Sequence, residues 1–218
     1  MLNAPVAFIN GTALTGPGYK GLNLHEALKP LTSDRQFANG NGRGILVIDE
    51  FDKVIEKAKR DEWAKQVEYS LLPILSGDIV QITDEEDGET HQMSFKNVLV
   101  FAMGVFDGVP MNHWKNHQTA QSALEIFGFT PEIVGRFSHF IGLQKQSLDS
   151  FEELITREYQ TIRLQYPLNG QEPYLEKSKL RKIAKESYQS PYGIRGARGL
   201  IHHHLFQEAY RMAPEALI

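Results

Sequence analysis

Two adjacent carboxylates, Asp49 and Glu50, directly follow the apolar run Gly44 to Ile48. A short β-branched run of this kind predicts a buried strand of a parallel sheet, and α/β proteins bind ligands at the carboxyl ends of such strands. In nucleotide hydrolysis, one carboxylate there holds Mg²⁺ and a second polarises the attacking water. We therefore expect Asp49 to hold the metal and Glu50 to act in catalysis. The alternative is a strand that simply ends in water.

Arg136 is a second candidate, because it lies between a short predicted helical turn, Pro131 to Val134, and an alternating stretch, Phe137 to Leu143. The planar guanidinium matches phosphate oxygens and can reach across a subunit boundary to stabilise the charge on a phosphate in transfer. The alternative for a single arginine is a surface salt bridge. The hypothesis for Arg136 therefore depends on the other motifs that accompany it.

Arg198 is placed in the first turn of the predicted last helix by the glycine-rich segment Tyr192 to Leu200. The dipole of a helix favours anions at this end, so a cation there suggests a bound anion such as a phosphate. The alternative is an arginine that extends over packed helices. The adjacent run His202 to His204 is not expected to bind one metal, because consecutive helical side chains point about 100° apart.

Tyr19 and Lys20 stand between two glycines, Gly18 and Gly21, in a polar loop. Nothing in the neighbouring sequence buries this aromatic ring. An ordinary turn whose tyrosine folds back onto the core is one explanation. These residues by themselves do not indicate a role in substrate contact.

Strands and helices alternate around these candidates. Val6 to Ile9 and Asn97 to Met103 are further apolar runs that predict buried parallel strands, and Phe137 to Leu143 predicts a fourth strand. A helix is expected from Leu22 to Leu31, stopped by Pro30. This order of elements predicts an α/β sheet.

A second helix and a hairpin are predicted between the carboxylate pair and the third strand. Apolar residues recur at helical spacing from Trp63 to Ile74, and Gly77 ends this pattern. Two alternating segments follow, Asp78 to Thr83 and Thr90 to Phe95, on either side of an acidic turn. This alternation predicts two antiparallel strands.

The spacing of apolar residues in the last third of the chain predicts helices. We expect a helix capped by Ser147, then helices from Lys177 to Tyr188 and from Ala197 to Met212. The change in character predicts two domains, a large α/β domain over residues 1–144 and a small α-helical domain over residues 145–218.

The amino-acid composition argues against some classes of function. The 218 residues carry a formal net charge of −4, so no overall basic field is available to hold a nucleic-acid backbone. The sequence has no cysteine, which fits a reducing compartment and makes the cytoplasm the expected location. The longest apolar stretch, Val98 to Phe106, is too short to span a bilayer. Neither nucleic acid nor membrane is therefore an expected partner.

Taken together and in this order, these segments resemble the AAA+ modules of the ClpX and HslU type, from about Val6 to about Tyr210. The resemblance implies an α/β fold class, with an AAA+ P-loop NTPase-like parallel sheet followed by a small α-helical domain. It also implies Mg²⁺ and ATP bound between the subunits of a hexameric ring. The family couples ATP hydrolysis to protein unfolding and translocation, and its usual partner is a self-compartmentalised protease.

The resemblance gives each candidate residue a role. It matches Asp49 and Glu50 to the Walker B motif, Arg136 to the arginine finger, Arg198 to the second nucleotide sensor, and Tyr19 with Lys20 to the pore loop that grips substrate protein.

One large departure from the family is the absence of any Gly-x-x-x-x-Gly-Lys-Ser/Thr phosphate-binding loop. Gly11 to Gly16 has the glycine spacing but lacks the lysine and the hydroxyl residue. In the family this loop, with its strand and helix, precedes the strand matching Val6 to Ile9, which places the gap before Met1. Its strand lies between those matching Asn97 to Met103 and Phe137 to Leu143. We therefore expect an incomplete sheet and weak ATP binding by this chain alone.

The leading hypothesis is a subunit, or a fragment of one, of a ClpX-like ATP-dependent unfoldase that acts on protein substrates. The alternative is a non-hydrolysing AAA+-like scaffold subunit that assembles with active partners. A DNA-directed AAA+ machine is a third reading, disfavoured by the pore-type segment Gly18 to Gly21 and by the absence of a basic patch.

Overall fold

A computed structural model describes residues 4–14, 24–32, 43–59, 62–83, 88, 90–166 and 173–212. The chain divides into two compact units, Met1–Gly142 and Leu143–Ile218. The division falls two residues before the boundary expected from the sequence.

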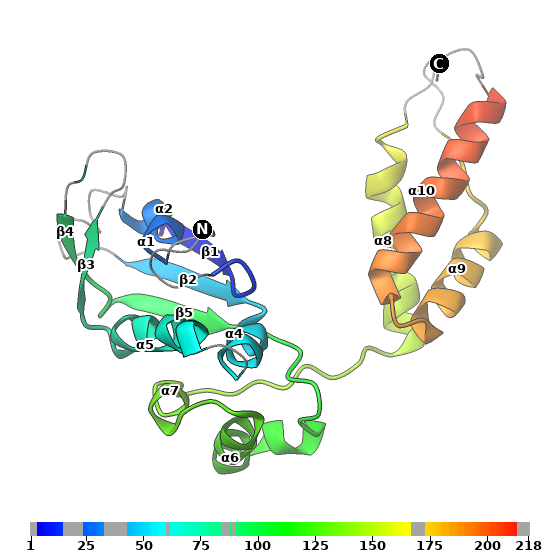
Figure 1. The fold of residues 1–218 in the computed structure, drawn as a ribbon. Helices are drawn as coiled ribbons and strands as arrows, with labels where there is room; N and C mark the ends of the chain where they lie inside the picture. Colours follow the sequence, from blue (N-terminus) through cyan, green and yellow to red (C-terminus); the bar gives the residue numbers. More distant parts are fainter. Residues whose placement is uncertain are drawn as a thin grey trace. The chain divides into compact units, whose positions relative to one another are not determined.

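The first unit is built on a parallel sheet of three strands, as predicted (Figure 1). Its strands are β1 (Val6–Asn10), β2 (Gly44–Asp49) and β5 (Val98–Ala102), in the order β1-β2-β5. The register aligns Val6 with Ile45 and Ile45 with Leu99. The α/β fold class is therefore confirmed, with β2 as the central strand.

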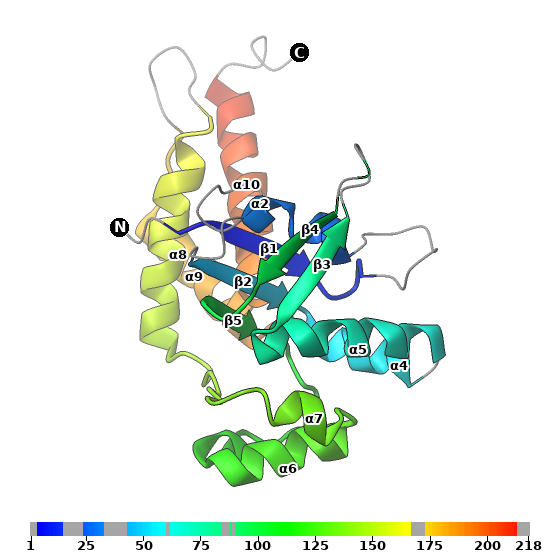
Figure 2. The same cartoon turned by 90° about the vertical axis from the view of Figure 1, so that its left-hand side faces the viewer.

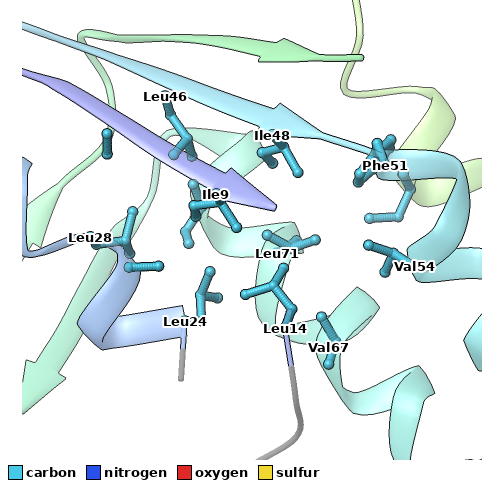
Figure 3. Close-up of a cluster of buried hydrophobic side chains, with 14 of the residues drawn as sticks. Ile9, Leu14, Leu24, Leu28, Leu46, Ile48, Phe51, Val54, Val67 and Leu71 are labelled. Carbon is cyan, nitrogen blue, oxygen red and sulfur yellow. The ribbon is translucent and has the colours of Figure 1, made fainter. Parts of the chain in front are cut away.

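Helices pack on one face of this sheet. They are α1 (Leu24–Ala27), α2 (Lys29–Thr32), α4 (Phe51–Ala58) and α5 (Glu62–Ser76). Alternate strand residues such as Ile9, Leu46 and Ile48 are buried against the apolar sides of these helices, near Leu28 and Leu71 (Figure 3). This one-sided layer holds the hydrophobic core of the unit.

The expected single helix from Leu22 to Leu31 is wrong in one respect. The described part of this segment forms two short helices, α1 and α2, and Pro30 lies inside the second one instead of ending the first. A proline fits the first turn of a helix because its missing N–H would have no intrahelical partner there. Leu28 and Leu31 are both fully buried, so core packing holds the two turns together.

The predicted hairpin is confirmed as a separate two-stranded ribbon of β3 (Ile79–Thr83) and β4 (Thr90–Ser94) (Figure 2). Gly77 turns the chain out of α5 with φ of 77°, a conformation that glycine adopts without strain. The Phe95 N–H then closes the base of the hairpin by donating to the Asp78 carbonyl at 3.0 Å. Residues 84–87 and 89 of the acidic turn lie outside the described residues.

After β5 come η1 (Met111–Lys115), α6 (His117–Phe127) and α7 (Pro131–Val134). The predicted fourth strand, Phe137 to Leu143, is not a strand in the structure. A β-strand requires a hydrogen-bonded neighbour, and the segment has none in the described part of the chain. Residues 137–143 therefore have the alternating polar and apolar pattern of a strand, but no neighbouring strand in the described part of the chain pairs with them.

The second unit is a bundle of three helices, α8 (Leu148–Arg163), α9 (Lys177–Gln189) and α10 (Gly193–Met212). Ser147 caps α8 as predicted, since its side chain accepts a hydrogen bond from the Ser150 N–H at 3.2 Å. The last helix begins four residues earlier than predicted, at Gly193 instead of Ala197. None of the helices among the described residues is both long and apolar enough to cross a membrane.

Candidate functional site

The predicted carboxylate pair lies at the carboxyl end of the central strand. Asp49 is the last residue of β2, and Glu50 follows with φ of 53° and ψ of 40°. This left-handed conformation costs a residue with a Cβ roughly 1–2 kcal/mol. The Asp49 Oδ1 atom accepts a hydrogen bond from the Glu50 N–H at 2.9 Å, and both side chains are exposed. The two carboxylates are thus presented to solvent by a strained turn.

Backbone contacts on both sides fix this turn. The Gly11 N–H donates to the Asp49 carbonyl at 2.7 Å, and the Phe51 N–H donates to the Met103 carbonyl at 2.8 Å. A Cβ on residue 11 would lie 2.6 Å from the Glu50 carbonyl oxygen, so only glycine fits this close approach. The ends of β1 and β5 therefore hold Glu50 in place.

A third carboxylate near the pair, Asp52, was missed by the sequence reasoning. Its side chain in the first turn of α4 is only 1% exposed. Its Oδ2 atom has no hydrogen-bond donor in the described part of the chain, although the Lys53 ammonium lies 3.5 Å away. The spacing in the sequence could have indicated Asp52, because an acid three residues after Asp49 lies one helical turn beyond the end of the strand.

Lys53 is the cation beside these acids. The pKa of Lys53 lies above its usual value, first because its ammonium donates a hydrogen bond to Glu56 at 2.9 Å. Desolvation lowers the pKa of Lys53 by less than this hydrogen bond raises it, and the charges of Asp52 and Glu56 raise it further. Lys53 therefore stays protonated and offsets part of the negative charge at the start of α4.

The carboxylate pair fits a Mg²⁺ ion in part. Mg²⁺ takes few protein carboxylates and completes its octahedron with water and phosphate oxygens, so the exposed Asp49 and Glu50 suit it. The described residues contain no cluster of three or more metal-ligating side chains that could enclose an ion on their own. A phosphate cradle does not fit, because the sequence has no phosphate-binding loop.

Arg136 is presented by a turn that is anchored in the core. It lies one residue beyond Gly135, the C-cap of the short helix α7, whose N-cap is Thr130. Both the N–H and the hydroxyl of Thr130 donate to the buried Glu68 carboxylate, at 3.2 and 3.0 Å. Arg136 itself is exposed, and no ion pair of Arg136 is found in the described part of the chain. The surface salt bridge that was the alternative explanation is therefore not observed there.

Aromatic packing brings the segments of Glu50 and Arg136 together. Phe51, which follows Glu50, lies with its ring centroid 5.8 Å from that of Phe137, which follows Arg136. The Phe51 ring also stacks on Phe129 with centroids 5.0 Å apart. The two candidate segments are thus tied through their neighbouring residues in one cluster of the first unit.

Arg198 lies in the second unit and has a partner there. Because α10 begins at Gly193, Arg198 is in the second helical turn and not in the first, as was expected. Its Nε atom lies 3.3 Å from an oxygen of Glu158 on α8, and its side chain is 54% exposed. The anion beside this arginine is a carboxylate, which agrees with the alternative of an arginine extended over packed helices. Its role as a nucleotide sensor stays a prediction.

Tyr19 and Lys20, the predicted substrate-contacting residues, lie outside the described residues. Among the three consecutive histidines, the His202 Nδ1 atom lies 2.8 Å from the Tyr166 hydroxyl, so this ring is part of the bundle. His203 is exposed and His204 pairs weakly with Gln207 at 3.4 Å.

No family model matches the chain. Curated proteins do match it over most of its length. The ATP-dependent Clp protease ATP-binding subunit ClpX 2 of Wolinella succinogenes is 27% identical over 229 residues. The ClpX subunits of Bacteroides thetaiotaomicron and Porphyromonas gingivalis are 25% and 24% identical.

In each case the match covers 92% of this chain and 58% of the relative. The resemblance to ClpX-type AAA+ proteins is thereby confirmed. The chain spans somewhat more than half of the length of the curated relatives that it matches.

Proposed function

We propose that this chain, a relative of the ClpX-type AAA+ ATPases, is the part of an ATP-dependent protein unfoldase that carries the hydrolytic carboxylates and the arginines. The observation that supports the proposal best is the turn after β2. There Asp49 and Glu50 are exposed at the carboxyl end of a central parallel strand, and Glu50 is held in a left-handed conformation by Gly11 and Met103. Backbone strain of this kind persists where the surroundings enforce it, which is common at functional sites.

In this proposal the two carboxylates have different roles in hydrolysis. Asp49, whose Oδ1 atom is engaged by the Glu50 N–H, offers its other oxygen to Mg²⁺ through water. Glu50 orients and polarises the water that attacks the terminal phosphate. Bound Mg²⁺ supplies the charge that neutralises the phosphate oxygens of ATP. The phosphate-binding loop that this chemistry requires comes from sequence outside these 218 residues.

The arginines act on nucleotide charge in the proposed assembly. Arg136, held by the Thr130–Glu68 contact and free of an ion pair in the described residues, extends towards the nucleotide of a neighbouring subunit in a homo-oligomeric ring. Arg198 leaves Glu158 and senses nucleotide from the small domain. Tyr19 and Lys20 contact substrate protein in the central pore. A hexameric ring in the cytoplasm, with a compartmentalised protease as partner, completes the proposal.

The first test is to sequence the coding DNA directly upstream of the codon for Met1. A strand followed by an in-frame phosphate-binding loop is the expected result, because Asp49 and Glu50 have no use in hydrolysis without one. A stop codon close upstream would contradict the proposal for this gene product.

The second test is ATP hydrolysis by the protein that includes such a loop. Glu50→Gln is expected to lower kcat by about 100-fold or more while nucleotide binding persists, because the group that polarises the water is lost. Glu56→Gln is the matched control, since Glu56 lies on α4 away from the strand end and pairs with Lys53. Equal losses in both variants would show that Glu50 has only a structural role.

A non-hydrolysing scaffold subunit is the second candidate. The observation in its favour is the lack of any Gly-x-x-x-x-Gly-Lys-Ser/Thr segment in the sequence. If the chain is such a scaffold, it assembles with ATPase partners, and Glu50→Gln leaves this assembly unchanged. Co-purification with a ClpX-type ring measures the assembly.

A further inference from the structure

Glu68 on α5 is one of two charged side chains that are buried among the described residues, and it is 7% exposed. None of the ion pairs found among those residues includes Glu68. Its Oε1 atom instead accepts hydrogen bonds from the N–H and the hydroxyl of Thr130. Taking a carboxylate out of water is costly unless it is hydrogen-bonded. The two donors of Thr130 therefore offset a cost that an apolar residue at this position would not have.

Thr130 is the N-cap of α7, the helix of four residues that precedes Arg136. Its hydroxyl donates to Glu68 at 3.0 Å and accepts a weak capping bond from the Ile133 N–H at 3.5 Å. A helix this short is not stable by itself, because forming a single turn is unfavourable. The helix lies against α5 (Figure 1). The contact with Glu68 thus fixes where α7 begins.

Backbone hydrogen bonds connect this start to Arg136. The Val134 N–H donates to the Thr130 carbonyl at 3.1 Å. The Arg136 N–H then donates to the Ile133 carbonyl, also at 3.1 Å. Ile133 and Val134 are fully buried, whereas Arg136 is exposed. Arg136 therefore has a backbone held by the core and a side chain that faces the solvent.

Aromatic rings hold the two ends of the same segment. Phe129 precedes Thr130, Phe137 follows Arg136, and both rings lie against Phe51, with centroids 5.0 and 5.8 Å away. Apolar packing of this kind does not depend strongly on direction. A hydrogen bond does, because it weakens steeply when donor and acceptor are misaligned. The contact with Glu68 therefore adds a control of orientation that the ring packing does not supply.

We propose that Glu68 is a positioning residue for Arg136. Its carboxylate orients Thr130 and, through α7, sets the point from which the guanidinium reaches outwards. An apolar side chain would attach α5 to α7 without the cost of desolvation, as the buried neighbours Val67 and Leu71 show on α5 itself. The carboxylate is thus better explained by orientation than by stability.

The effect of Glu68 is expected in the neighbouring subunit. This expectation rests on the proposed function, in which Arg136 acts on the nucleotide of the next subunit in a ring. Glu68 makes its contact on α5 and α7, away from the turn that presents Glu50. Loss of Glu68 should therefore lower kcat at the neighbour's site, while KM for ATP changes by less than about twofold.

The first experiment measures the position of the turn in the 218-residue chain itself. Glu68→Leu is expected to speed amide hydrogen exchange at Arg136 by at least about tenfold, with no change at Leu46 in the central strand. Glu68→Gln is expected to keep most of the protection, because one amide oxygen can accept both donors of Thr130. Glu132→Leu is the matched control, since Glu132 lies on α7 but is exposed.

A pair of variants at Thr130 tests the same contact from the other side. Thr130→Val keeps the shape of the side chain but removes the hydroxyl, and it is expected to speed exchange at Arg136 by about threefold or more. Thr130→Ser retains the hydroxyl and is expected to stay near the original rate. Combining Thr130→Val with Glu68→Leu is expected to add little to Glu68→Leu alone, because both changes remove one interaction.

The second experiment separates a subunit's own site from its neighbour's site, in the ATPase that includes a phosphate-binding loop. Glu68→Leu is expected to lower kcat by about tenfold or more, and Glu50→Gln by about 100-fold or more. Mixed in equal amounts, the two variants are expected to recover about a quarter of the original kcat. About a quarter of the interfaces then combine an intact Glu50 with a correctly placed arginine. Arg136→Ala mixed with Glu50→Gln is the reference.

The outcomes distinguish this inference from the proposed function. Unchanged exchange at Arg136 in both Glu68→Leu and Thr130→Val would overturn the inference, and so would faster exchange with an unchanged kcat. A third contradiction is recovery in the Arg136→Ala mixture but none in the Glu68→Leu mixture, because Glu68 would then act on its own subunit alone. If the Arg136→Ala mixture itself recovers nothing, the proposed role of Arg136 is wrong and the inference fails with it.

Discussion

The two units of the chain differ in how completely they bury their apolar residues. In the bundle, all three helices contribute to one core, in which Ile155, Tyr159 and Ile201 are almost fully buried, while Phe206 and Tyr210 on the outer side of α10 are about half exposed. In the first unit, Ile9 and Leu46 are equally buried, yet Phe8 on the other face of the same strand is 69% exposed. All three helices of the bundle share one core, whereas the sheet is covered by helices on one side only. The candidate hydrolytic site lies in the unit that contains this sheet.

The largest effect is expected in the bundle. Ile201→Ala removes a fully buried side chain from α10 and is expected to destabilise the bundle by about 2–5 kcal/mol, because a cavity remains. Hydrogen exchange of the α8–α10 amides measures the loss separately from the first unit. The neighbouring Leu200→Ala is the control, since Leu200 is 37% exposed, and its effect is expected to stay within about 0.5 kcal/mol. Equal losses would contradict a closed core.

The second comparison sets the two faces of β1 against each other. Ile9→Ala is expected to cost about 2–5 kcal/mol, because Ile9 is buried under the helices. Phe8→Gln, on the opposite face of the sheet where Phe8 is 69% exposed, is expected to change the free energy of unfolding of this chain by less than about 0.5 kcal/mol and to improve its solubility. Denaturant unfolding measures the two changes in free energy, and sedimentation measures the solubility of the Phe8→Gln variant. A large loss for Phe8→Gln would mean that this face is already covered in the chain.

A smaller effect is expected at the close approach to the candidate site. Gly11→Ala introduces a Cβ that would lie 2.6 Å from the Glu50 carbonyl oxygen, and overpacking of this kind costs about 1–3 kcal/mol. Gly199→Ala is the matched control, because among the described residues no atom other than the neighbouring α10 backbone lies within 4 Å of its Cβ position. The control is expected to gain stability by about 0.5–1 kcal/mol, since alanine favours the helix. Thermal unfolding of the two variants distinguishes the outcomes.

The smallest effect is expected at the strained residue itself. Glu50→Gly relieves a left-handed conformation but adds freedom to the unfolded chain, so stability should stay level or rise by up to about 1 kcal/mol. Gln66→Gly, in the interior of α5, should lose about 1 kcal/mol instead. Denaturant midpoints measure the difference. A loss at Glu50→Gly as large as that at Gln66→Gly would contradict backbone strain at residue 50.

Much of this fold could be predicted from periodicity. The apolar runs of β1, β2 and β5, the helical spacing of α5 and the alternation of the hairpin all indicated the observed elements. These signals are local, because a buried parallel strand or an amphipathic helix shows its burial in its own sequence. The pattern of residues 137–143 is equally strong, yet no strand forms there. Pairing depends on a neighbour, which a local pattern does not reveal.

The candidate site was predictable in its residue types but not in its geometry. The position of Asp49 and Glu50 at a strand end followed from the sequence. The left-handed conformation of Glu50 depends on hydrogen bonds from Gly11 and to Met103, which lie far away along the chain. The burial of Asp52 and the pairing of Arg198 with Glu158 likewise arise from tertiary packing.

The central claim is that this chain holds the hydrolytic carboxylates of a nucleotide site whose phosphate contacts lie elsewhere. Titration of Mg²⁺-ATP into the 218-residue chain, followed by calorimetry, tests it most directly. No saturable binding to the chain alone is expected, because its sequence has no phosphate-binding loop to contact the nucleotide. Stoichiometric binding of Mg²⁺-ATP to the chain alone, lost on Asp49→Ala, would contradict it.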